Sequence, residues 1–138
     1  MAPVLVSQSL TLCWETFAGR GRFLSGVEEI AAFCARHPGF GCCYDTAHAR
    51  KATAEVLKDL RSHEGVIKVV HLSSWCDDAQ HLRASDPQGK LDGAPVVRDL
   101  AQRGFRGPVV LEYLPAFRRW LVPDALALQR IAAQAREE

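Results

Sequence analysis

Residues 40–45 read FGCCYD, an uncharged run that closes on an aspartate. A strand that is apolar on both faces is typical of a parallel α/β sheet, in which helices cover both sides. Three more short apolar runs also close on a residue that can bind a metal, namely LTLCWE at 10–15, VIKVVH at 66–71 and PVVLE at 108–112. Each interval between these runs leaves room for one helix and two loops. The sequence therefore predicts four strands that alternate with helices.

Helix signals occupy the intervals between the runs. A helix is predicted to begin at Ser25, because Ser25 and Glu28 form an S-x-x-E capping box, and to stop at His37-Pro38-Gly39. Further helices are predicted over 53–63, over 95–103 and from Pro123 onward. The polar segment 72–93 is predicted to be a long loop, which in a compact domain is usually functional. The pattern is (βα)₄ in one domain, 1–138, with a parallel sheet and right-handed crossovers.

Composition limits the class of protein. The chain has 138 residues, of which 48% are hydrophobic and 24% charged, as in an ordinary globular domain. A net charge of +1 gives no general electrostatic case for a nucleic-acid or membrane partner. No apolar run approaches the roughly 20 residues that span a bilayer. The N-terminus lacks the basic start of a signal peptide, so a cytoplasmic location is expected.

The five cysteines favour free thiols over disulfides. Their number is odd, three of them lie within apolar runs, and no C-x-x-C pair is present. Buried free thiols fit a reducing compartment. A zinc site made of thiolates is not expected.

The four residues that close the apolar runs are the candidate metal ligands: Glu15, Asp45, His71 and Glu112. A parallel sheet brings the ends of its strands to one edge, where sites of this fold class lie. Carboxylate oxygens with one imidazole suit manganese, magnesium, zinc or cobalt. The alternative is that the four are separate salt-bridge or capping residues. Four such residues in the same position on successive strands favour one shared site.

Three further residues are candidates for contacts with a substrate. His48, three residues after Asp45 in DTAH, could bind a second metal or a substrate, or could simply cap a helix. His81, in the long polar segment, could close over the site as a ligand or proton shuttle, or could be solvated. Arg20 lies in a glycine-containing basic loop that could hold a phosphate, although solvated charge is the plainer interpretation.

Four motifs resemble a known family in this order and spacing: ETFAGRG at 15–21, CYDTAH at 43–48, VVHLSS at 69–74 and GPVVLEY at 107–113. They resemble the C-terminal half of the xylose-isomerase-like TIM barrels. That superfamily contains metal-dependent sugar isomerases and epimerases, and also endonuclease IV. The resemblance implies an α/β fold, the (βα)₄ half of a TIM barrel with parallel strands.

The epimerase branch implies one activity. There, the positions matching the four candidate ligands hold one divalent metal, often manganese, and the positions of Glu15 and Glu112 also form an acid/base pair beside a carbonyl. His48 matches a substrate-binding histidine. The resemblance thus implies a sugar or sugar phosphate as substrate, with magnesium, cobalt or zinc as alternatives to manganese.

The endonuclease IV branch implies another activity, a metal-dependent phosphodiesterase on abasic DNA. The stretch ETFAGRG resembles the ENTAGQG loop of that branch, in which these positions belong to a three-zinc cluster. Three departures count against it. An acidic residue is replaced by Ser74, the loop D-x-H reads Ala79-Gln80-His81, and the two histidines of the N-terminal half are missing. The near-neutral net charge also gives little attraction to a DNA backbone.

Half a barrel leaves an apolar inner face and two open sheet edges. Self-association into a homo-oligomer, pairing with another chain that supplies the missing half-barrel, or a truncated reading frame would each account for this. A third function, from a different class, is that of a non-catalytic barrel remnant that acts as a binding module.

Overall fold

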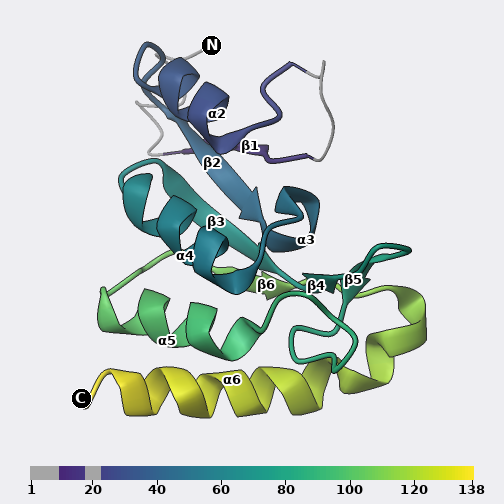
Figure 1. Cartoon of the computed structure of the whole chain (residues 1–138). Helices are drawn as coiled ribbons and strands as arrows, with labels where there is room; N and C mark the ends of the chain where they lie inside the picture. The colour runs from purple at the N-terminus through teal and green to yellow at the C-terminus, as the bar shows by residue number, and fades with distance from the viewer. Residues whose placement is uncertain (1–9, 18–22) are drawn as a thin grey trace.

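The computed structural model describes residues 10–17 and 23–138. Within them, four strands form one parallel sheet (Figure 1). These strands are β1 (Leu12–Glu15), β2 (Phe40–Asp45), β3 (Ile67–Leu72) and β6 (Val109–Leu111). Their order across the sheet, β1-β2-β3-β6, is their order along the chain. The predicted (βα)₄ pattern, the parallel half of a TIM barrel, is confirmed.

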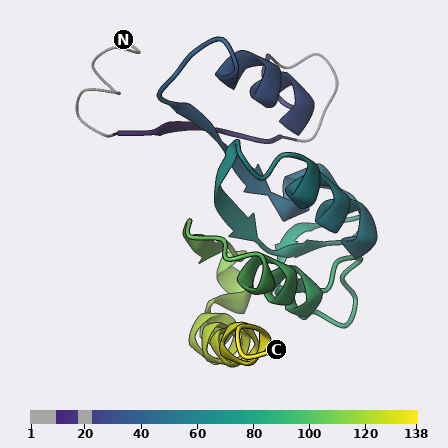
Figure 2. The ribbon, with the colours of Figure 1, turned by 90° about the vertical axis from the view of Figure 1, so that its left-hand side faces the viewer.

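Helices cover one face of the sheet. They are α2 (Val27–Cys34), α4 (Thr53–Ser62), α5 (Gly93–Gln102) and α6 (Leu121–Ala135), which packs along α5. In Figure 2 these helices lie to one side of the curved sheet. Tyr44 and Val70, partners in the register of β2 and β3, point into the core beneath them. Their neighbours Cys43, Asp45 and His71 point away from the helices, because successive side chains of a strand alternate between faces.

The start of α2 differs from the prediction. Gly26 is the N-cap and makes no side-chain hydrogen bond, so the capping box of Ser25 and Glu28 does not form. The carboxylate of Glu29 instead accepts from the Ser25 N–H at 3.1 Å. Glu29, four residues after Ser25, thus accepts the hydrogen bond that a glutamate three residues after the cap accepts in a capping box. The predicted start at Ser25 is therefore wrong, since α2 begins at Val27, two residues later.

The polar segment 72–93 is only partly a loop. It contains an antiparallel hairpin of β4 (Ser74–Trp75) and β5 (Gln80–Leu82). Helix α5 begins at Gly93, because the carboxylate of Asp92 accepts from the Ala94 N–H at 3.0 Å. The last helix begins earlier than Pro123, since the 3₁₀ turn η1 (Pro115–Trp120) leads directly into α6. These polar residues therefore form defined structure beside the strand ends.

The two edges of the sheet are open within the described part of the chain. Strands β1 and β6 each pair on one side only. Apolar side chains on these edges are exposed, with Leu12 at 46%, Val110 at 42% and Val109 at 39%. Between β6, α5 and α6 lies a cavity of about 210 Å³ lined chiefly by apolar side chains. The sheet thus has the unpaired edges expected of half a barrel.

All five cysteines are free thiols, and two of them, Cys42 and Cys43, are buried. Across residues 10–17 and 23–138, no helix combines the length and the apolar character that crossing a membrane requires.

Candidate metal site

The four predicted ligands lie together at the C-terminal edge of the sheet. Glu15 and Asp45 end β1 and β2, His71 is the penultimate residue of β3, and Glu112 directly follows β6. One ligand atom from each residue lies within 4.8 Å of the others. The edge strands contribute Glu15 and Glu112, so the curvature of the sheet brings the two glutamates toward each other.

The imidazole of His71 lies among the three carboxylates. Its Nδ1 is 2.8 Å from Glu112 Oε2, 3.4 Å from Glu15 Oε1 and 3.7 Å from Asp45 Oδ2. Even so, His71 Nδ1 and Asp45 Oδ2 are buried without a hydrogen bond of acceptable geometry. The contact with Glu112 is an ion pair only when the imidazole of His71 is protonated. Buried polar atoms normally have partners, so these two atoms need a further group between them.

A divalent cation fits this donor set. Three carboxylates around one imidazole concentrate negative charge, and Asp45 is fully buried. Burial of an uncompensated charge is strongly unfavourable, whereas coordination of a cation would satisfy both unpartnered atoms at once. Oxygen-rich sets with one imidazole suit hard or borderline divalent ions.

Two threonines hold the backbone on either side of Asp45, and the His48 N–H orients its carboxylate. Thr16 Oγ1 accepts from the Asp45 N–H at 2.9 Å and so joins the ends of β1 and β2. Asp45 Oδ1 accepts from the His48 N–H at 2.8 Å and caps the short helix α3 (Thr46–Ala49), which leaves Oδ2 for the cluster. Thr46 Oγ1 donates to the Ser73 oxygen at 2.6 Å and accepts from the Ser73 N–H at 3.0 Å. In the sequence, what marks Thr16 and Thr46 is that each directly follows a candidate ligand.

His48 lies beside the cluster rather than acting as a cap. Its Nδ1 is 3.0 Å from the Thr16 oxygen and 3.3 Å from Glu15 Oε1. Its ring stacks on Phe17, with centroids 4.9 Å apart. The helix cap at this point is Asp45.

His81 lies on β5 and is part-buried, so it is not a solvated loop histidine. Its Nε2 is 3.2 Å from His48 Nε2, and its Nδ1 is 3.2 Å from Ser73 Oγ. Asp45, His48 and His81 together form a second group with the spacing of metal ligands. The contact of Ser73 with His81 could not be predicted, because a single buried serine forms no recognisable sequence pattern.

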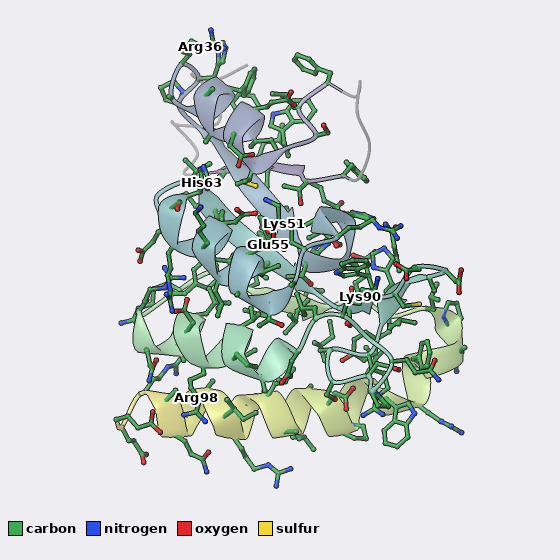
Figure 3. All side chains as sticks on the ribbon, in the orientation of Figure 1. Arg36, Lys51, Glu55, His63, Lys90 and Arg98 are labelled. Carbon is green, nitrogen blue, oxygen red and sulfur yellow. The ribbon has the colours of Figure 1, made fainter. Side chains whose placement is uncertain are left out.

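The arginine predicted to hold a phosphate, Arg20, lies outside the described residues. Arg50, which was not predicted, lies instead at the rim of the site. Its backbone is left-handed, with φ of 50°, and its guanidinium donates to the Cys76 and Asp77 oxygens at 3.4 and 3.3 Å. Arg50, Gln80 and His81 line an open hollow beside the cluster. Lys51, next to α4 in Figure 3, is instead paired with Asp59, which also accepts from the Tyr44 hydroxyl.

Cys43 lies on the same face as the cluster but does not belong to either group of residues with the spacing of metal ligands. Burial is the main cause that raises the pKa of its thiol to about 12, and Glu15 and Asp45 add to the shift. Without a metal, the thiol is therefore protonated near neutral pH. The candidate ligands are carboxylates and imidazoles.

Three side chains, Arg83, Tyr113 and Asp124, form a hydrogen-bond network beside the candidate metal site. Arg83 donates to both carboxylate oxygens of Asp124, from Nε at 3.0 Å and Nη2 at 2.7 Å, and the Tyr113 hydroxyl donates to Oδ2 at 3.0 Å. Arg83 follows His81 by two residues, and Tyr113 directly follows Glu112. Asp124, in the first turn of α6, thus holds the segments that carry two site residues.

Comparisons with known proteins agree with this architecture. The structure resembles that of a 3-keto-D-glucoside 4-epimerase from E. coli in its apo form, with a TM-score of 0.64 and 13% sequence identity. The match covers 99% of this chain and 49% of that one, so this chain spans about half the length of its solved neighbour. A search of curated proteins finds no match. Residues 1–131 match the family described as xylose isomerase-like TIM barrel, and the chain belongs to that family.

Proposed function

We propose that this chain carries the metal-dependent active site of a sugar isomerase or epimerase. The observation that carries the proposal is the pair of buried, unpartnered atoms, Asp45 Oδ2 and His71 Nδ1, within a ring of carboxylates. The xylose isomerase-like family and the fold of the solved epimerase support a sugar as the substrate. Glu15, Asp45, His71 and Glu112 would hold one divalent ion, with manganese as the first candidate.

The proposed chemistry moves one proton at the carbon beside a carbonyl. When bound, the metal would polarise the carbonyl and hydroxyl oxygens of the sugar and so make the neighbouring C–H more acidic. One glutamate, Glu15 or Glu112, takes the proton from that carbon, and the other returns a proton, as general base and general acid. The two come from opposite edges of the sheet, which suits transfer between two faces of a substrate. His48 and His81 would contact substrate hydroxyls.

The proposed activity requires a complete barrel. With open edges at β1 and β6, the site has walls on one side only within the described residues. A second copy of the chain, a different chain, or a further segment of a longer protein would supply the other four strands. The sugar or sugar phosphate would then be enclosed between the two halves.

Metal analysis of the purified protein tests the site directly. About one ion per chain is expected after incubation with manganese and gel filtration, and Asp45→Asn should lose it, because that variant removes the buried carboxylate. Glu137→Gln, which changes a glutamate far from the cluster, is the matched control and should retain the ion. A wild-type content below about 0.2 ions per chain would reject the metal site.

Proton exchange tests the reaction. We expect manganese-dependent incorporation of solvent deuterium into ketoses, detected by mass spectrometry. Glu112→Gln should reduce the rate by about 100-fold or more, because a glutamine cannot exchange the proton. A metal-loaded protein with a completed barrel that exchanges no proton with any ketose would reject this reaction.

The second ligand group supports an alternative, an endonuclease IV-like phosphodiesterase. Asp45, His48 and His81 could hold a second ion beside the first. Cleavage of abasic duplex DNA in the presence of zinc would favour this activity. However, Ser74 and Ala79 still stand where that branch has acidic residues, which makes it the weaker candidate.

A further inference from the structure

An open hollow of about 520 Å³ lies beside the candidate metal site. Its lining comes from the end of α3, from the hairpin of β4 and β5, and from Leu114 after β6. Figure 1 shows this hairpin next to α3. We propose that the hollow is a subsite for a neutral sugar unit, and that the substrate carries this unit attached to the sugar that reacts at the metal. The second part of the proposal rests on the proposed function.

The hollow adjoins the candidate metal site. His81 lines the hollow, and its Nε2 also lies 3.2 Å from His48 Nε2. Arg50 follows His48 by two residues, and Leu114 follows Glu112 by two. The volume lies in the range of small-molecule sites, about 300–1,000 Å³. A substituent on a sugar at the metal can therefore reach the hollow.

The charged groups of the hollow balance one another. Asp77 and Asp78 contribute carboxylates and Arg50 contributes a guanidinium. Lys90 pairs with the Asp77 carboxylate, so one charge of each sign remains. A phosphate would share the hollow with a carboxylate, and an ammonium group would share it with the guanidinium. Because like charges repel, the hollow suits a neutral ligand better than either ion.

Hydrogen-bonding groups remain available in the hollow. Arg50 Nη2 donates to the backbone oxygens of Cys76 and Asp77, whereas its Nε and Nη1 make no hydrogen bond among the described residues. Within the same part of the chain, the Gln80 amide and the Asp78 carboxylate have no hydrogen-bond partner either. Together these groups offer several donors and acceptors. Neighbouring sugar hydroxyls, each both a donor and an acceptor, can satisfy both kinds of group.

The hollow also offers an apolar surface and a fixed donor. Leu114, which is 38% exposed, and Ala79 line it beside the polar groups. A sugar ring has hydroxyl edges and C–H faces, so it can contact both kinds of surface. The guanidinium of Arg50 lies over Trp75, with Cζ 5.1 Å from the ring centroid. A donor that is already held in place loses little conformational entropy when a ligand binds.

Ligand-observed nuclear magnetic resonance tests the subsite apart from the metal. The full chain is treated with a chelator and titrated with methyl glucosides and methyl galactosides, and saturation-transfer difference signals report binding. We expect weak binding, which Gln80→Ala should reduce by about 5-fold and Arg50→Gln by about 10-fold, through loss of hydrogen bonds. Gln102→Ala and Arg98→Gln, on α5 and outside the hollow, are the matched controls and should bind as the wild type.

A second comparison tests the link to the reacting sugar. With manganese bound, isomaltulose and lactulose, in which a fructose unit carries glucose or galactose, should bind about 10-fold more tightly than D-fructose, because the added unit gains about two hydrogen bonds. Gln80→Ala should reduce this advantage by about 5-fold and leave the affinity for D-fructose unchanged. Failure of the proposed function would appear in the metal content and in proton exchange, and would leave the chelator experiment intact.

Two results would overturn the subsite. One is that none of the methyl glycosides binds, or that they bind Gln80→Ala and Arg50→Gln as tightly as the wild type. The other is a preference for glucose 6-phosphate or glucosamine over the methyl glucosides, which would show that the hollow takes a charged group. If Arg50→Gln loosens the hairpin, Gln80→Ala and Asp78→Ala decide the test, since neither side chain has a hydrogen bond to lose among the described residues.

Discussion

Single hydroxyl groups hold the strand ends at the site. Thr16 and Thr46 each follow a candidate ligand and bond across to the next strand. That the four candidate ligands lie together could be predicted from the sequence, because each closes an apolar run and parallel strands end at one edge. The threonines and Ser73 could not, since a hydroxyl reveals its partner only when the chain has folded. The ligands follow from pattern, but the bonds that orient them depend on tertiary contacts.

Thr46→Val tests one of these hydroxyl groups. The variant keeps the shape of a fully buried side chain and removes both bonds to the Ser73 backbone. The free energy of unfolding should fall by about 2–3 kcal/mol, because two backbone groups are left buried and unpaired. Urea denaturation measures the change. Thr53→Val, which removes an exposed bond to the Asp92 N–H, should cost about 1 kcal/mol or less. Equal losses for the two variants would contradict this account.

The buried thiols predict an alkaline loss of stability. Burial is the largest cause that raises the pKa of Cys42 and of Cys43 from 9.0 to about 12. Because the folded chain holds these protons more tightly than the unfolded chain, their contribution is complete below pH 9 and is lost as pH rises toward 12. Chemical denaturation across this range should show a shallower decline for Cys43→Ala than for the wild type. An identical slope would show that the pKa of this thiol is the same in the folded and the unfolded chain.

The elements differ in how much of them the sequence predicts. Each of the four core strands overlaps its predicted run, and α4 begins at the predicted residue, since apolar patterning defines them. The hairpin of β4 and β5 was not predicted, because residues elsewhere in the chain hold it in place. Trp75 Nε1 donates to the Lys51 oxygen, and Arg50 donates to the tip of the hairpin. His81 therefore reaches His48 through an element that local sequence does not specify.

Arg83→Met tests how α6 holds this hairpin. The variant leaves the buried carboxylate of Asp124 with the Tyr113 hydroxyl as its remaining hydrogen-bond partner among the described side chains. We expect a loss of about 3 kcal/mol in the free energy of unfolding. Arg98→Met is the matched control, because the exposed Arg98 (Figure 3) pairs with Glu138 at the surface and should cost less than about 1 kcal/mol. A small effect of Arg83→Met would mean that apolar packing alone positions the hairpin.

At the scale of the whole molecule, the two open edges of the sheet indicate that the chain needs further strands to complete a barrel. The helices cover one face, while β1 and β6 each lack a neighbour within the described residues (Figure 2). A second copy related by a two-fold axis would pair β6 of each chain with β1 of the other and close an eight-stranded barrel. It would also bring two clusters of three carboxylates to the same mouth. Like charges at short range repel, so self-pairing is opposed by the same residues that would bind metal.

Self-association should therefore depend on divalent cations. In light scattering after gel filtration, the wild type should approach the mass of two chains with manganese and shift toward one chain with chelator, because bound cations neutralise the carboxylates. Leu12→Lys places a charge on the β1 edge, where the native side chain is 46% exposed, and should give one chain in both conditions. Ala54→Lys, at an exposed position of α4, the helix that connects the inner strands β2 and β3, should behave as the wild type. A wild type that stays monomeric with its site filled would contradict self-pairing and assign the other half-barrel to a different polypeptide segment.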